Sequence, residues 1–252
     1  EADSKRAKTL ASQSNEFLAK QISLNPARYR GFACLALQEP RDAAKELRRC
    51  IDEYKFVGAL INGHTNGIYL DDKRNWPFWQ TAAELEVPVY LHQADSYDEP
   101  HVYSGRPELN GATCSWTCET AAHALRLVFG GVFEDFPNLK IILGHMGEAL
   151  PFWMWRLDFM GAPGGRAGRF NKLKPSEYFK RNFAITTSGV EDPLALRFCI
   201  EKLGIESVMW AIDYPFQATA PAVAFLENAK LSEQERNLIS HGNAERIFKI
   251  KA

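Results

Sequence analysis

The sequence predicts an α/β fold in which parallel strands and helices alternate as in a (β/α) barrel. Two observations carry this prediction. Short apolar segments of strand length alternate with longer segments of helical period from about Gly31 to the end of the chain. In addition, several of the apolar segments end on a polar side chain, and in a barrel such strand ends meet at one mouth. An open doubly wound sheet explains fewer of these positions, because only strands beside its switch point share a crevice.

Six segments have the length and composition of strands. Several of them are apolar nearly throughout, which is typical of parallel strands that helices cover on both faces. The six are residues 32–37, 57–62, 87–92, 140–145, 183–188 and 208–213.

Helical patterns fill the intervals between these strands. Pro40, Pro77 and Pro193 lie near predicted helix starts, where a missing N–H group costs little. Residues 161–168, rich in Gly and Ala, are expected to form a mobile excursion, and no linker divides the chain, so residues 1–252 should be one domain. The predicted helices span residues 5–24, 42–53, 76–86, 119–136, 193–203 and 233–248.

The composition excludes several classes of protein. The 252 residues include 46% hydrophobic and 24% charged residues, a balance typical of a globular domain with a sizeable core. Thirty basic and 31 acidic residues give a net charge of -1, so the basic patch of a nucleic-acid binder is not expected. The longest apolar stretches, such as residues 56–61, are far shorter than the roughly 20 residues of a membrane helix, so no membrane partner is expected.

The N-terminus and the cysteines indicate the cellular compartment. The first residues lack the apolar core of a signal peptide. Five scattered cysteines do not form a disulfide framework, and Cys114 and Cys118 have no second pair with which to complete a zinc cage. A cytoplasmic location is therefore expected.

Four polar residues close predicted strands: His92, His145, Ser188 and Asp213. Two imidazoles and a carboxylate suit a divalent metal such as zinc, or manganese in oxygen-rich company. Each residue alone is more often an ordinary polar strand end, but three such ends in one chain favour a site. Glu148, three residues after His145, can orient the imidazole by accepting its N–H.

Two blocks of sequence stand out: Leu-Gly-His-Met-Gly-Glu at residues 143–148 and Ile-Asp-Tyr-Pro-Phe at residues 212–216. Weaker blocks lie at residues 56–63, 69–72, 76–79, 87–92, 119–126 and 243–248. Together these blocks resemble those of the amidohydrolase-related, metal-dependent decarboxylases of hydroxylated aromatic acids, which include gamma-resorcylate, 2,3-dihydroxybenzoate and 5-carboxyvanillate decarboxylases. The resemblance runs from about residue 25 to the end.

This resemblance implies a distorted (β/α)₈ barrel that holds one divalent metal ion, zinc or manganese, and needs no organic cofactor. It implies that His92 is a metal ligand and that Asp213 is a ligand that also handles protons. It makes His145 a catalytic residue that does not bind the metal, with Glu148 supporting it. The residues alone had left His145 as a third ligand, and the family pattern takes precedence.

The chain also departs from the family pattern. Family members begin with a strand that carries a Glu-x-His or His-x-His pair of metal ligands, and no such strand precedes Gly31. We therefore expect that the first two βα units are missing from this chain. Gln93-Ala94-Asp95 stands where close relatives often carry Pro-Arg, which leaves the choice of substrate open.

Three further residues are candidates for substrate binding. His64 follows a predicted strand end, Phe152 offers a ring for stacking, and Arg156 offers a partner for a carboxylate. Core packing of Phe152 and pairing of Arg156 with Asp158 or Glu148 are the alternatives.

The expected function is metal-dependent, non-oxidative decarboxylation of a hydroxylated aromatic carboxylic acid of the dihydroxybenzoate kind. The alternatives are a metal-dependent hydrolase or hydratase of the same superfamily, or a metal-free, non-catalytic barrel if the first ligand pair is truly absent. The expected partners are a small aromatic carboxylate and further copies of the chain, as a homo-oligomer (dimer or tetramer).

Overall fold

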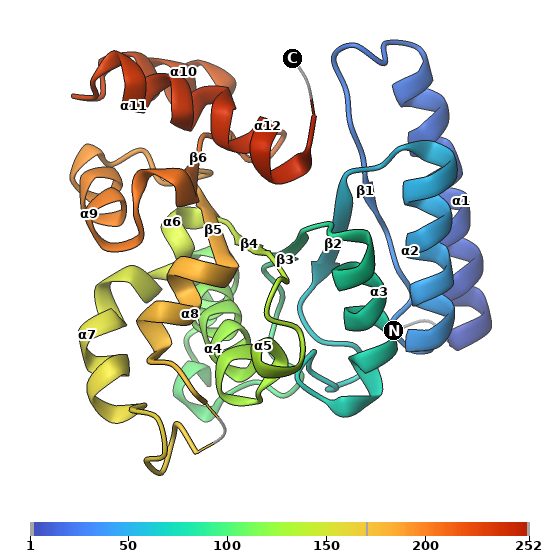
Figure 1. Cartoon of the computed structure of the whole chain (residues 1–252), viewed down its shortest axis with the longest axis horizontal. Coiled ribbons are helices and arrows are strands. Elements are labelled where there is room, and N and C mark those ends of the chain that lie inside the picture. The colour runs from blue at the N-terminus through green and yellow to red at the C-terminus, as the bar shows by residue number, and fades with distance from the viewer. Residues whose placement is uncertain (1–2, 170, 251–252) are drawn as a thin grey trace. The chain divides into compact units, whose positions relative to one another are not determined.

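The computed structural model describes residues 3–169 and 171–250. The chain divides between Leu139 and Lys140 into two compact units. Within the described residues each unit contains three parallel strands that alternate with helices (Figure 1).

In the first unit, each strand pairs with the next strand along the chain. The register of β2 and β3 places Asn62 opposite His92, so that both strands end at the same level. The elements are α1 (Ser4–Ser23), β1 (Phe32–Ala33), α2 (Pro40–Tyr54), β2 (Gly58–Asn62), α3 (Trp76–Leu85), β3 (Val89–His92), α4 (Ser115–Phe129) and α5 (Val132–Asp135).

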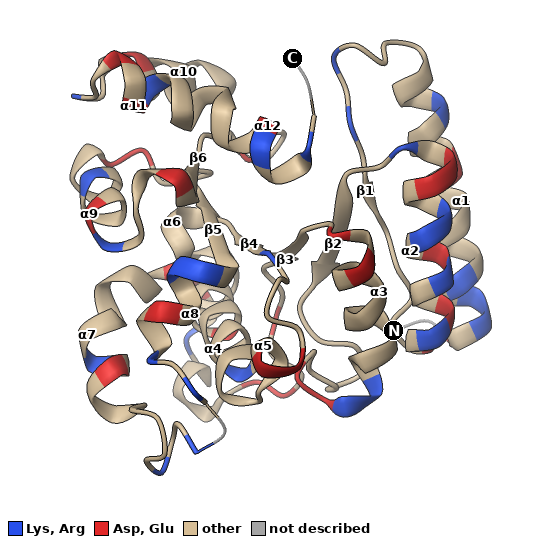
Figure 2. Cartoon of the chain, in the orientation of Figure 1, with Lys and Arg blue, Asp and Glu red and all other residues tan. Residues whose placement is uncertain are grey.

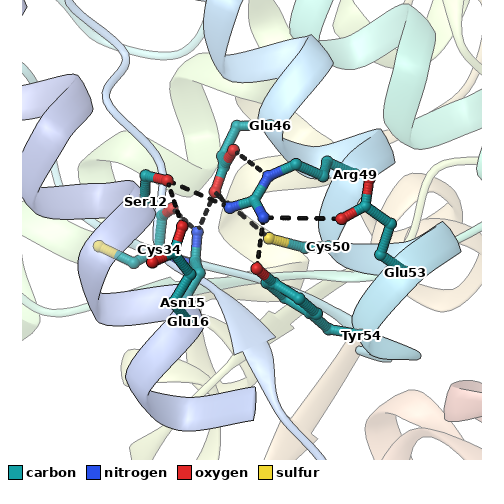
Figure 3. Close-up of polar contacts among 9 residues, drawn as sticks. All are labelled: Ser12, Asn15, Glu16, Cys34, Glu46, Arg49, Cys50, Glu53 and Tyr54. Carbon is teal, nitrogen blue, oxygen red and sulfur yellow. Dashed lines mark hydrogen bonds and ion pairs between the residues drawn. The ribbon is translucent and has the colours of Figure 1, made fainter. Parts of the chain in front are cut away.

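A buried side chain, Asn15, fastens α1 to the rest of the first unit (Figure 3). Its amide nitrogen donates to the carbonyl of Cys34 at 2.9 Å and to Glu46 Oε1 at 2.7 Å, and its oxygen accepts from the N–H of Cys34 at 2.8 Å. Arg49 in turn donates to both oxygens of Glu46, at 2.9 and 2.7 Å. Cys34 directly follows β1. The Asn15 amide bonds both the N–H and the C=O of Cys34, as the backbone of a neighbouring strand would.

Charges of both signs are interspersed along α1 and α2 (Figure 2). Two of the pairs they form join helices: Lys8 with Asp42 at 2.9 Å, and Arg48 with Glu84 at 2.6 Å. Both pairs are exposed and screened by solvent, so each contributes little to stability.

The second unit has the more completely buried strands. Every residue of β4 and of β5 is buried, as the apolar pattern predicts for parallel strands covered on both faces. The elements are β4 (Ile141–Leu143), α6 (His145–Glu148), α7 (Leu150–Met160), α8 (Pro175–Asn182), β5 (Phe183–Thr186), α9 (Pro193–Leu203), β6 (Val208–Met209), α10 (Thr219–Asn228), α11 (Glu233–Asn237) and α12 (Asn243–Phe248).

All six strands are shorter than predicted, and β1 and β6 fall furthest short. The strand expected over residues 32–37 ends at Ala33, because the next residue bonds to the side chain of Asn15. The strand expected over residues 208–213 ends at Met209, after which Trp210 donates to a carbonyl outside the sheet. In both places hydrogen bonds from outside the ladder satisfy the backbone.

The helices differ from prediction in two ways. The helix expected over residues 119–136 is interrupted at Gly130 and Gly131, the latter with φ +79°, and the helix expected over residues 233–248 contains a π turn at Leu238–Gly242. Two further helices, α8 and α10, were not predicted.

The described residues contain no helix that is both long enough and apolar enough to cross a membrane. All five cysteines are free thiols.

Candidate active site

His145 lies immediately after β4 and Gly144, at the start of a left-handed turn. The φ angles of His145, Met146, Gly147, Glu148 and Ala149 are +50°, +54°, +76°, +55° and +60°. For residues other than glycine this conformation costs roughly 1–2 kcal/mol each. Such strain persists only where surrounding structure determines it, and it is concentrated at functional sites.

Packing and hydrogen bonds hold this turn in place. The N–H of Gly147 donates to the carbonyl of Gly144 at 2.7 Å, and the buried thiol of Cys199 lies 3.6 Å from the carbonyl of Met146. A Cβ atom at Gly147 would come within 2.9 Å of the Ile185 side chain, so no larger residue fits there without a shift of the strand.

The turn brings His145 between two carboxylates of the second unit. Its Nδ1 lies 2.9 Å from Oε1 of Glu148, which is buried, and its Nε2 lies 3.8 Å from Oδ2 of Asp213. Burial tends to lower the pKa of His145, but the hydrogen bond and charge of Glu148, with a smaller contribution from Asp213, raise that pKa overall. The site therefore favours an imidazolium between two carboxylates.

Asp213 is held in an unusual backbone conformation of its own. Its φ is +74°, its side chain is 22% exposed, and its carbonyl accepts from the N–H of Gln217 at 3.0 Å. The peptide bond between Tyr214 and Pro215 is cis. The structure thus brings together three of the predicted site residues, His145, Glu148 and Asp213, in one part of the second unit.

The other two predicted residues of the second unit lie on α7. Phe152 is 77% exposed, and its ring centroid is 6.0 Å from that of Phe198. Arg156 is also exposed, while Asp158, proposed as its alternative partner, accepts from the hydroxyl of Ser176 at 2.7 Å. No described contact joins Phe152 or Arg156 to His145, so their roles in substrate binding stay predictions.

In the first unit, His92 is the last residue of β3 and is half-buried. Its Nδ1 lies 2.9 Å from the carbonyl of Gln93, which can only accept, so Nδ1 carries the proton. In the neutral ring the lone pair is then on Nε2. This is the tautomer of a metal-binding histidine whose other nitrogen bonds a carbonyl.

His64 belongs to a polar and aromatic cluster that sequence reasoning did not find. Its ring makes edge contacts with the rings of Tyr69 and Tyr97, at centroid distances of 5.5 and 5.6 Å. Glu119 ties this cluster together, because it accepts from the Tyr69 hydroxyl at 2.5 Å and from the Ser96 hydroxyl at 2.8 Å. Burial and the hydrogen bond to Glu119 raise the pKa of Tyr69 to about 12, so the phenol stays protonated.

The donors for a metal ion fit in kind. A neutral imidazole at His92 and a carboxylate at Asp213 are both ligands that zinc and manganese accept. Across residues 3–169 and 171–250, however, no three His, Cys, Asp or Glu side chains gather closely enough to hold an ion by themselves. The predicted ligand set is therefore incomplete in the part of the chain that the structure describes.

The residues 187–189, which follow β5, were the least anticipated part of the site. Ser188 was recognised as a polar strand end, but neither Thr187 nor Gly189 was identified. A Cβ atom at Gly189 would lie 3.2 Å from Cδ2 of His145 and 3.7 Å from Oδ2 of Asp213. A run of Thr, Ser and Gly directly after a buried apolar strand is the signal that could have identified them.

Comparisons with known proteins identify the family to which the chain is similar. A family model described as Amidohydrolase matches residues 1–250. The gamma-resorcylate decarboxylase of Polaromonas sp. (strain JS666) is 42% identical over 257 residues, which cover 99% of this chain and 79% of the relative.

Two solved structures match closely as well. One is a dihydroxybenzoic acid decarboxylase from Polaromonas sp. JS666 with bound manganese and 2-nitroresorcinol, at 43% identity and a TM-score of 0.93, with 98% of this chain and 77% of that chain covered. The other is 5-carboxyvanillate decarboxylase from Sphingomonas paucimobilis, at 42% identity and a TM-score of 0.92, with 99% and 75% covered. The predicted fold class, an α/β barrel of the metal-dependent hydrolase type, and the predicted family resemblance are both confirmed by these matches.

Proposed function

This chain belongs to the amidohydrolase family, and we propose that it catalyses the metal-dependent, non-oxidative decarboxylation of a hydroxylated aromatic acid of the dihydroxybenzoate kind. The observation that carries the proposal is the placement of His145 between Glu148 and Asp213. An imidazole and a carboxylate at this distance can together supply a proton to a substrate. The decarboxylases that match nearly the whole chain support the same reaction.

The reaction needs one proton and no oxidant. In the proposed mechanism Asp213 donates a proton to the ring carbon that bears the carboxylate. The bond between that carbon and the carboxylate then breaks, its electron pair returns to the ring, and carbon dioxide leaves. Protonation is the difficult step because it interrupts aromaticity, so a positioned acid should supply much of the rate.

His145 restores the proton to Asp213. Its raised pKa favours the protonated imidazole, and its Nε2 is 3.8 Å from the carboxylate. Glu148 holds the ring in this orientation through Nδ1 and stabilises its positive charge. This division of roles is a proposal that the geometry supports.

A divalent ion, when bound, would supply positive charge toward the carboxylate and phenolic oxygens of the substrate. His92 and Asp213 stay the predicted ligands, and manganese is favoured over zinc because a matching decarboxylase contains it. We also retain as predictions a homo-oligomeric state, a cytoplasmic location and a single domain over the whole chain.

Product analysis tests the proposal. The manganese-loaded protein should release carbon dioxide from 2,6-dihydroxybenzoate, 2,3-dihydroxybenzoate or 5-carboxyvanillate at equal rates with and without oxygen. In deuterium oxide the phenolic product should carry one deuterium at the carbon that bore the carboxylate. A product heavier than its substrate by one water would instead identify a hydratase or hydrolase, in which His145 acts as a base toward water.

A further inference from the structure

Residues 186–189 lie close to both His145 and Asp213. Thr186 is the last residue of β5, which Figure 1 labels, and residues 187–189 follow it. Thr186, Thr187 and Ser188 are each less than 5% exposed, although all three carry hydroxyl groups. Buried hydroxyls require hydrogen-bond partners, and those partners reveal what the segment holds.

One face of this segment contacts the backbone of His145. The hydroxyl of Ser188 accepts from the N–H of His145 at 3.3 Å, and the hydroxyls of Thr186 and Ser188 share a hydrogen bond at 2.9 Å. The bond to His145 is at the long end of the usual range. It nevertheless gives a partner to the N–H of His145, which is the first residue of the left-handed turn. The hydrogen bond with Thr186 orients the Ser188 hydroxyl that accepts from this N–H.

The opposite face contacts the chain that leads to Asp213. The N–H of Thr187 donates to the carbonyl of Met209 at 3.0 Å, which is the last rung of the ladder with β6. Beyond it the Thr187 hydroxyl donates to the carbonyl of Ala211 at 3.1 Å and accepts from the N–H of Ala211 at 3.1 Å. A single side chain thus holds both backbone groups of the residue two positions before Asp213.

Gly189 completes the arrangement by its lack of a side chain. Its φ is +67°, and an added Cβ would lie 3.7 Å from Nε2 of His145 as well as 3.2 Å from Cδ2 of the same ring. A side chain at this position would therefore contact both the imidazole of His145 and the carboxylate of Asp213.

We infer that Thr187 and Ser188 are positioning residues that set the separation of His145 and Asp213, one by holding the chain before Asp213 and the other by holding the backbone of His145. As a statement about turnover this inference rests on the proposed function. Both residues act through others: neither hydroxyl has a described contact with the side chain of His145 or of Asp213. Proton transfer depends steeply on such a separation, and a misplacement of about 1 Å can cost about 10²-fold in rate.

The experiment compares four variants of the metal-loaded protein: Thr187→Val, Thr187→Ser, Ser188→Ala and Ser176→Ala. Thr187→Val keeps the side-chain shape and removes the hydroxyl, and it should lower kcat by about tenfold or more with KM changed less than about threefold. Thr187→Ser should restore most of kcat because it restores the hydroxyl. Ser188→Ala should resemble Thr187→Val.

Ser176→Ala is the matched control. It also removes a hydrogen-bonded hydroxyl of the second unit, at 2.7 Å from Asp158. It should shift the melting temperature without lowering kcat, which separates positioning from a general loss of stability.

A double-mutant comparison makes the test specific to the pair. When Asp213→Asn has already removed the proton donor, Thr187→Val should cause little additional loss of kcat, since residues that act together are not additive. Equal fractional losses in both backgrounds would contradict the inference. So would a Thr187→Val variant whose kcat equals that of Ser176→Ala.

A structural readout keeps the inference separable from the proposed function. If the wild-type protein releases no carbon dioxide, the proposed function fails, and the inference is decided by hydrogen exchange and crystallography. Ser188→Ala should speed exchange of the amide of His145, and Thr187→Val should change the distance between Nε2 of His145 and Oδ2 of Asp213. Unchanged exchange and an unchanged distance in both variants would overturn it.

Discussion

His145 and Asp213 approach each other through Nε2 and Oδ2 at 3.8 Å, and both residues have positive φ angles. At this separation a small movement of either group makes or breaks a hydrogen bond. The pair is therefore suited to pass a proton in one geometry and to hold it in another.

Asp213→Asn should abolish decarboxylation more completely than it weakens metal or substrate binding. An amide of nearly the same shape still offers an oxygen to a metal, but it cannot donate an acidic proton at neutral pH. We expect kcat to fall by on the order of 10²–10⁴-fold. Asp192→Asn is the control, because Asp192 caps α9 and Asn caps a helix equally well. A variant of Asp213 that kept more than about a tenth of the wild-type kcat would show that the proton comes from elsewhere.

Glu148→Gln should lower the pKa of His145. The substitution removes the buried negative charge at 2.9 Å while preserving the shape of the side chain. The limb of the pH profile of kcat/KM that reports His145 should therefore move to lower pH, and an NMR titration of the imidazole should move with it.

Glu245→Gln provides the control for this prediction. It removes the carboxylate from another pair of the second unit, His241 with Glu245 at 2.7 Å, and should leave the pH profile in place. A profile that moved equally in both variants would exclude a specific effect on His145.

His92→Ala and His145→Ala should have different effects on metal content. His92 has the tautomer of a ligand, so its loss should reduce the bound metal together with activity. Loss of His145 should remove activity and spare the metal, and the exposed His101 can be changed to Ala as a control that keeps both. If both site variants lost metal equally, metal analysis would show that His145 is also a ligand.

Removing the metal with a chelator and adding manganese back should abolish and then recover the activity of the wild type.

Ala149→Gly should stabilise the protein, against the usual effect of glycine. Ala149 is exposed and has φ +60°, a conformation that glycine adopts without strain, so the free energy of unfolding should rise by up to about 1 kcal/mol. The same change at Ala224, exposed within α10, should lower it by about 0.5–1 kcal/mol. Denaturant unfolding of both variants checks the opposite signs.

Asn15→Ala should lower the free energy of unfolding by about 1–3 kcal/mol, because it removes the three hydrogen bonds that the buried Asn15 amide makes to Cys34 and Glu46. Gln13→Ala, an exposed position on the same helix, should change it by less than about 0.5 kcal/mol. Similar losses in the two variants would show that α1 is held by its apolar contacts and not by the amide.

The sequence was informative about the strands because their burial on both faces leaves an uninterrupted apolar run. It was less informative about the extent of α7, whose exposed face carries Phe152, Trp155 and Phe159. A helix without a polar face has no amphipathic period, so periodicity does not locate the end of α7. Strand ends such as those of β1 and β6 depend on side chains distant in sequence, among them Asn15 and Thr187, and periodicity does not report these.

The candidate site was predicted only in part for a related reason. The contact of His145 with Glu148 follows from their spacing of three residues, and it is present. The spacing does not reveal that the chain is left-handed there. Glycine content alone did not reveal this, since four of the five residues with positive φ are not glycine. The contribution of Thr187 depends on its pairing with Ala211, which only the assembled sheet creates.

The left-handed turn after β4 has a consequence for how the protein folds. A free peptide with the sequence of residues 144–149 would populate right-handed and extended conformations, because the hydrogen bonds within it offset only part of the steric preference of four L-residues. Ile185 of β5 and Cys199 of α9 pack against the turn, and these contacts are present only in the assembled second unit. We therefore expect the second unit to acquire its sheet first and its reactive imidazole last, so that a nascent or partly unfolded chain has no competent proton donor.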